Sequence, residues 1–201
     1  MIQPKALYPV QKCYKEKWTF RLLAYMHQGF FQSTLKRLKT RAIYRAILDK
    51  DCNRVRELIQ SGTEIDKEYC DFNPLGFAAY RGTKEIIEVL LEMGANINYK
   101  NSFGYTPLTY AVDRVSPKII DTLLKAGANI KVKAYDDRNL LALAVVRGHI
   151  HLISMLVDAG ADINALDDEG YSVIDIAEQL RRIKAIKLLE ELGAKYSYEI
   201  S

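Results

Sequence analysis

The sequence lacks the features that mark several large protein classes. No stretch reaches the roughly 18 apolar residues of a membrane-spanning helix, and the uncharged run over residues 22–35 is interrupted by polar side chains. Neither the apolar core of a signal peptide nor an Asn-x-Ser/Thr glycosylation acceptor occurs. These absences predict an intracellular protein, most simply a cytoplasmic one.

Cysteine is scarce, and the motifs of catalysis are missing. The three cysteines, at positions 13, 52 and 70, are odd in number and lack C-x-x-C spacing, so we expect reduced thiols rather than a zinc site or a disulfide scaffold. No glycine-rich phosphate loop, G-x-x-x-x-G-K or G-x-S-x-G is present. We therefore expect no enzymatic activity, no cofactor, no metal and no small-molecule substrate.

Acidic residues are almost absent from the first part of the chain. Residues 1–45 hold ten lysines and arginines but only Glu16 as an acid, whereas the formal charge of the whole chain is only +4. The chain is therefore divided into a basic head and an acidic body.

A four-residue motif recurs with constant spacing. Gly-Ala-Asn-Ile stands at 94–97 and 127–130, Gly-Ala-Asp-Ile stands at 160–163, and Gly-Ala begins again at 193. Successive glycines are 33 residues apart, and Gly62 precedes the series by 32. Because an apolar helical run precedes each glycine, the spacing indicates a repeat architecture.

Residues 101–133 show what one repeat contains. Thr106-Pro107-Leu108 predicts a short helix, since threonine can cap the helix and proline suits its first position. A second helix begins near Pro117 and ends at Gly127, and a polar hairpin, called the finger below, leads to the next unit. One unit cannot bury its own apolar face, so the units must stack.

These motifs resemble the ankyrin repeat. Gly-Tyr-Thr-Pro-Leu at 104–108 followed by Leu-Leu-Lys-Ala-Gly-Ala-Asn-Ile at 123–130 carries the resemblance. It implies an all-α solenoid of stacked helix pairs with hairpin fingers over 40–201. Val115 and Arg181 stand where Gly82 and Gly148 stand in other repeats, so we expect looser turns there. The expected repeats are about 40–66, 67–100, 101–133, 134–166 and 167–199.

Ankyrin-repeat proteins bind protein partners, and the resemblance places the contact on the finger tips and the exposed side of each first helix, along a concave face. Aromatic residues recur at equivalent finger positions, and arginines recur every 33 residues at the end of the first helices. Both types are enriched at binding hot spots, although tyrosines could instead cover the finger backbone. The expected contact residues are Tyr69, Phe72, Tyr80, Arg81, Phe103, Tyr105, Arg114, Tyr135, Arg138, Arg147 and Tyr171.

Residues 1–39 predict an extended arm followed by a basic amphipathic helix. This extension could dock on an acidic protein, lie on an anionic membrane surface or contact RNA, and it could equally pack on the first repeat as a cap. Its basic, acid-poor composition also resembles a mitochondrial targeting segment. The expected anchor residues are Trp18, Arg21, Tyr25, Phe30, Phe31, Lys36 and Arg37.

Together these features predict a non-catalytic adaptor or accessory subunit of a larger intracellular, multi-subunit assembly. The solenoid would grip one protein while the basic extension anchors the chain to a second surface. Two alternatives remain open at this point: an RNA-contacting subunit of a ribonucleoprotein through residues 1–45, and an effector or inhibitor that captures one target protein.

Overall fold

The computed structural model describes residue 38, residues 40–133 and residues 138–200. The predicted N-terminal arm and its anchor residues lie outside these ranges. A helix over 40–48 is followed by α3 (Cys52–Gln60), α4 (Pro74–Arg81), α5 (Lys84–Glu92), α6 (Pro107–Asp113), α7 (Pro117–Lys125), α8 (Leu140–Arg147), α9 (Ile150–Asp158), α10 (Val173–Gln179), α11 (Ile183–Glu191) and α12 (Ser197–Ile200).

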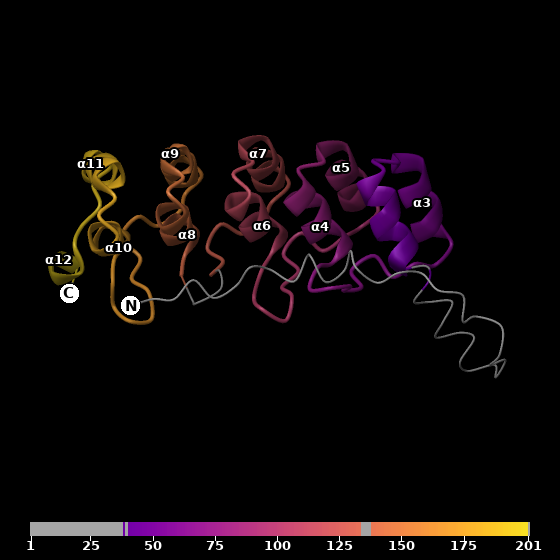
Figure 1. Ribbon diagram of the computed structural model, residues 1–201, viewed down its shortest axis with the longest axis horizontal. Coiled ribbons are helices and arrows are strands. Elements are labelled where there is room, and N and C mark those ends of the chain that lie inside the picture. The colour runs from indigo at the N-terminus through magenta and orange to yellow at the C-terminus, as the bar shows by residue number, and fades with distance from the viewer. Residues whose placement is uncertain (1–37, 39, 134–137, 201) are drawn as a thin grey trace.

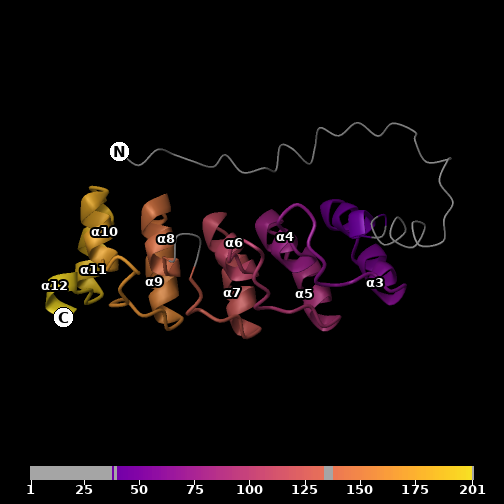
Figure 2. The same ribbon diagram turned by 90° about the horizontal axis from the view of Figure 1, so that it is seen from below.

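The helices pair and stack in two layers (Figure 1). The first helices of the pairs, α4, α6, α8 and α10, form one layer, and the second helices, α5, α7, α9 and α11, form the other. Seen from below, successive pairs stand in one row with similar directions (Figure 2). Between the pairs, on the side away from the second-helix layer, the chain forms the fingers. The predicted all-α solenoid of helix pairs is confirmed.

The helices α4, α6, α8 and α10 all begin on side-chain caps, whether or not their repeat has the Thr-Pro-Leu motif. The Asn73 and Thr106 side chains accept hydrogen bonds from the backbone N–H groups of Gly76 and Thr109. Asn139 does the same for Ala142 at 2.7 Å, and Ser172 for Asp175 at 3.4 Å. Asparagine and serine therefore start α8 and α10 without the Thr-Pro-Leu motif, because any short oxygen-bearing side chain can accept from an unpaired amide of the first turn.

The apolar core runs without interruption through the stack. Each second helix buries residues at helical spacing, as in α7, where Ile119, Ile120 and Leu123 are buried. The equivalent set in α9 is Leu152, Ile153 and Leu156. Since each pair touches mainly its sequence neighbours, stability is a sum of repeat and interface terms.

Hydrogen bonds also join the loops that follow successive second helices. The backbone N–H of Asn96 donates to the Asp66 carboxylate, and that of Asn129 donates to the Asn98 side chain at 2.8 Å. Lys195 repeats the contact with Asn164 at 2.9 Å. This ladder pairs backbone donors that would otherwise depend on water, and it fixes the spacing between neighbouring loops.

The turns inside the helix pairs are uniform, in contrast to the expected loosening. Gly82 and Gly148 adopt the left-handed conformation with φ of 71° and 79°, and Val115 and Arg181 adopt it as well, with φ of 54° and 53°. The two turns that lack glycine therefore keep the same conformation, at the cost of backbone strain at Val115 and Arg181. For a β-branched residue such as Val115 this conformation is a genuine outlier.

Val115→Gly is expected to raise the free energy of unfolding by about 1 kcal/mol. Glycine removes the clash of Cβ in the left-handed conformation, and the half-exposed valine gives up little packing. Urea unfolding followed by circular dichroism measures the change. Val115→Ala is the matched control, because alanine keeps Cβ and should recover only part of the gain. A destabilised glycine variant would show that the valine side chain contributes more than the strain costs.

The described cysteines differ from each other. Cys52 is a free thiol at the start of α3, packed against the core, as predicted. Cys70 is disulfide-bonded, so the prediction of reduced thiols is wrong for this residue.

Candidate protein-binding face

Two predicted contact residues are buried instead of exposed. Phe72 and Tyr105 each stand just before the cap of a first helix and keep only 7% and 6% of their surface exposed. Phe72 packs edge-on against Phe77, and Tyr105 stacks on Tyr110, with ring centroids 5.6 Å and 5.0 Å apart. In both pairs, the residue before the cap meets the fourth helical residue, which is the hydrophobic staple. The expected exposure of these two residues is therefore wrong, and their packing gives them a structural role.

Tyr110 connects these rings into one cluster. Its ring also stacks on Phe72 at 4.6 Å, and its hydroxyl donates to the backbone oxygen of Asp71 at 3.0 Å. Asn101 donates to the same oxygen, at 2.6 Å. The cluster links the finger that contains Asp71 to the finger that contains Asn101 and makes this surface rigid.

The helix over 40–48 supports the same cluster through Tyr44. The Tyr44 hydroxyl donates to the backbone oxygens of Phe72 and Lys67. Burial raises the pKa of Tyr44 far above its ordinary value, because the phenolate could not be solvated there. Tyr44 therefore keeps its hydroxyl hydrogen and donates it at every physiological pH. Its ring packs against that of Tyr69, with the ring centroids 5.5 Å apart.

Two of the predicted tyrosines lie at the surface with an arginine beside each. Tyr69 is half-buried, and the guanidinium of Arg41 lies 5.6 Å from its ring centroid. Tyr80 is half-buried at the end of α4, and the guanidinium of Arg114 lies 4.8 Å from its ring centroid. Such cation–π pairs hold the arginine in place.

The predicted arginines form a row along the turns, which we call the turn ridge and define as Arg81, Arg114 and Arg147. All three are exposed and occupy the same position of successive first helices. Arg114 reaches back to Tyr80 of the preceding repeat, and Arg147 reaches back to the Asp113 carboxylate at 2.7 Å. Two of the three ridge arginines are thus held by contacts between neighbouring repeats.

The finger tips present separate aromatic side chains. Phe103 is 51% exposed and Tyr171 is 40% exposed, and they stand on fingers two repeats apart. Arg138 is half-buried beside the cap of α8. Tyr135 lies outside the described residues. Because Phe72 and Tyr105 are buried, the exposed finger aromatics do not form a contiguous patch over adjacent fingers.

Two exposed apolar residues on the α10–α11 turn are absent from the expected contact residues. Leu180 and Ile183 are 39% and 61% exposed there. Leu180 holds the position that Arg81, Arg114 and Arg147 hold in earlier repeats. The change from arginine to leucine at this position was the signal available in the sequence, because it shows that the last repeat presents a different surface from the others.

Other kinds of site find no support in the part of the chain that the structure describes. Within residues 38, 40–133 and 138–200, no group of three or more histidine, cysteine, aspartate or glutamate side chains is placed to hold a metal ion. Over the same residues, no helix has the length and apolar character needed to cross a membrane.

Comparison with known proteins agrees with this architecture. A family model described as "Ankyrin repeats (3 copies)" matches residues 43–134, and one described as "Ankyrin repeats (many copies)" matches residues 140–190. The chain belongs to the ankyrin-repeat family, whose repeats are generic protein–protein interaction modules and typically non-catalytic.

A curated relative shares part of the repeat array. Ankyrin repeat and SOCS box protein 5 from Bos taurus is 39% identical over 61 residues, which is 30% of this chain. The chain spans 18% of that relative's length, so the similarity concerns the repeats and not the relative as a whole.

Proposed function

We propose that this protein is a non-catalytic adaptor or accessory subunit that binds a partner protein with the turn ridge, Tyr80 and the finger tip at Phe103. The single observation that carries this proposal is the row of exposed arginines, with Arg114 held over the half-buried ring of Tyr80. Arginine and aromatic side chains dominate the energetics of protein interfaces. Because Arg114 and Arg147 are held in place before binding, these two side chains lose little conformational entropy on association.

The opposite layer supports this assignment by contrast. Charged residues of the second helices neutralise one another, as in the ion pairs Arg56 with Glu92 and Lys125 with Asp121. Exposed pairs of this kind contribute little energy and offer no net charge to a partner. In the turn ridge Arg147 is paired with Asp113, whereas Arg81 and Arg114 have no ion pair among the described residues. Positive charges of this kind attract acidic surfaces and speed association.

The basic extension supplies a second contact in this proposal. Residues 1–45 carry ten basic residues against one acid, which suits an acidic protein surface. The same charge suits RNA, and an RNA contact would weaken steeply with salt and disappear with nuclease. Capture of a single target, as by an effector or inhibitor, would use the same face. The predicted intracellular location belongs to this proposal and is tested by cell fractionation.

The proposal is tested by affinity capture from native extract with the full-length chain as bait. Arg114→Ala and Phe103→Ala are each expected to weaken the capture of specific partners by about 30-fold, the equivalent of about 2 kcal/mol. Lys125→Ala on the outer face of α7 is the matched control, because it removes an exposed charge from the other layer. Each bait is used with and without nuclease, and with residues 1–39 deleted.

The outcomes separate the alternatives. Partners that survive nuclease and are lost with Arg114→Ala and Phe103→Ala support the protein-binding face. Partners that vanish with nuclease make the extension an RNA anchor and remove the adaptor role. Equal capture by all of the solenoid variants would place the contact elsewhere and contradict the proposal.

A further inference from the structure

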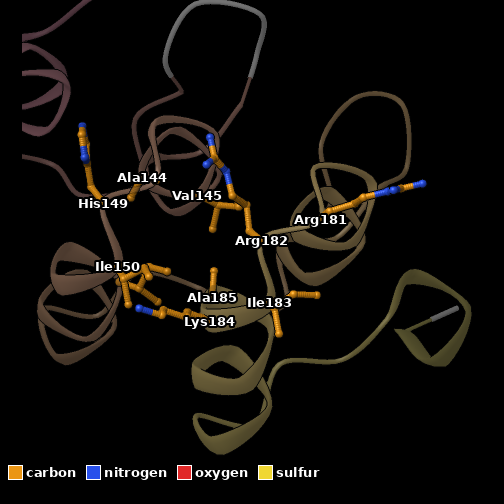
Figure 3. A pocket seen from close by; sticks show the side chains of 11 residues that line it. Ala144, Val145, His149, Ile150, Arg181, Arg182, Ile183, Lys184 and Ala185 are labelled. Carbon is orange, nitrogen blue, oxygen red and sulfur yellow. The ribbon is translucent and has the colours of Figure 1, made fainter.

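A groove lies between the α8–α9 turn and the α10–α11 turn, with a volume of about 250 Å³ (Figure 3). Its floor consists of the buried side chains of Val145, Ile153 and Ala185. Ile150 lines one side, and the largely exposed Ile183 stands at the other edge. The surface here is therefore apolar, hollow and open to solvent.

Gly148 of the α8–α9 turn and Arg182 of the α10–α11 turn lie against each other at the groove. Arg182 lies across Gly148, with its guanidinium 3.5 Å from the place that a Cβ of residue 148 would occupy. Its Nη2 atom donates to the backbone oxygen of Val146 at 3.2 Å. The guanidinium thus bridges the last two full repeats and forms a fixed wall, and Figure 3 shows it rising from the α10–α11 turn toward Val145.

The rim of the groove is basic. Arg181, Arg182 and Lys184 line it, and no carboxylate is among its lining residues. Figure 3 shows Lys184 reaching toward Ile150 while Arg181 points outward. Burial lowers the pKa of His149, and the neighbouring Arg147 lowers it further, whereas Asp113 raises it; the net shift is downward. His149 therefore adds little positive charge to the rim at neutral pH. The groove therefore combines an apolar floor with a positive edge.

That combination selects the occupant. When an apolar side chain fills the floor, the groups on either side of it lie beside several cations, and carboxylates complement that charge best. The chain's own extension, residues 1–39, carries eight basic residues against the single acid Glu16 and would be repelled. We propose that this groove seats an acidic segment of a partner protein through one large apolar side chain flanked by aspartate or glutamate. The inference rests on the proposed protein-binding function and names the chemistry of the partner.

The test uses the full-length chain and a panel of short fluorescein-labelled peptides of aspartate and glutamate with one central residue: leucine, isoleucine, phenylalanine, methionine or alanine. Fluorescence anisotropy measures binding. At least one peptide with a large apolar centre should bind saturably, about tenfold or more tightly than the alanine peptide, since a buried side chain contributes on that order. Ile183→Ala and Lys184→Glu should each weaken this peptide about tenfold. Lys187→Glu, an exposed charge on the same helix, is the matched control.

Three results would overturn the inference. The first is equal binding of all centres, which would indicate charge attraction alone. The second is the absence of saturable binding in the whole panel. The third is concentration-dependent self-association of the chain that Ile183→Ala abolishes, which would make a second copy the occupant. The groove variants leave Arg114 and Phe103 unchanged. The peptide experiment can therefore contradict the groove inference while the capture experiment still supports the protein-binding face, and the capture experiment can likewise fail while the groove inference holds.

Discussion

Asn101→Ala is expected to lower the free energy of unfolding by about 2–4 kcal/mol, because this side chain makes four buried or half-buried hydrogen bonds. Its Oδ1 atom accepts from the backbone N–H groups of Phe103 and Tyr105, at 3.0 Å and 2.8 Å. Its Nδ2 atom donates to the Asp71 carbonyl and to the Tyr110 hydroxyl. Alanine would remove the acceptor of the two finger amides, while the Asp71 carbonyl and the Tyr110 hydroxyl would keep their hydrogen bond to each other.

The fifth repeat offers a natural control for this prediction. Asp167 accepts from the backbone N–H groups of Glu169 and Tyr171, at 3.0 Å and 2.8 Å, just as Asn101 does in its own finger. Asp167 stands in a more exposed finger, and its carboxylate cannot donate a hydrogen bond to the neighbouring finger. Asp167→Ala should therefore cost only about 1 kcal/mol, and Asp167→Asn should be nearly neutral.

Asn101→Asp divides the effect into its two parts. The carboxylate can still accept the two finger amides, but it cannot donate to the Asp71 carbonyl. We expect the free energy of unfolding of Asn101→Asp to lie between that of the wild type and that of Asn101→Ala. Urea unfolding followed by circular dichroism measures it. If Asn101→Ala costs no more than Asp167→Ala, the link between the second and third fingers contributes nothing, and the account of a rigid aromatic cluster is wrong.

Leu123→Ala is the second large effect, with an expected loss of about 2–5 kcal/mol. Leu123 is completely buried in α7, in the middle repeat of the array. Truncation removes apolar contacts and leaves a cavity that the neighbouring helices fill only in part. Because repeats in a solenoid are stabilised by their neighbours, weakening the middle repeat should also uncouple the two ends.

Urea unfolding should then show a broader transition, or two transitions, in Leu123→Ala. Leu166→Ala is the matched control, since Leu166 is 40% exposed and its truncation should cost less than about 1 kcal/mol. A single sharp transition shifted by no more than the control would mean that the middle repeat does not couple the two halves.

The sequence predicted the fold well because the fold depends on periodic features. The glycine spacing of 33 residues, the capped helix starts and the apolar runs each repeat, and every one of them has a local physical cause. The turns at Val115 and Arg181 were predicted less well. The interpretation assumed that a residue with Cβ would loosen the turn, whereas the packing of the two helices imposes the left-handed conformation, with φ near 54° in both.

The binding face was only partly predictable, because equivalent sequence positions need not be equally exposed. Phe72, Tyr105 and Tyr171 share one column, yet only Tyr171 is exposed. The difference lies in the fourth residue of the following helix, which is aromatic at Phe77 and Tyr110 and aliphatic at Ile176. An aromatic staple partner covers the preceding ring. The groove near Arg182 depends on a contact between two turns and left no motif in the sequence.

The most direct test of the central claim is hydrogen–deuterium exchange of the full-length chain, alone and in a complex with a partner captured as described above. The account predicts slower exchange in the finger at 101–105 and along the turns at 80–83 and 113–116 when the partner is bound. Exchange in the outer helices α5 and α7 should not change. Protection confined to those outer helices, with the fingers and turns unaffected, would contradict the assignment of the binding face.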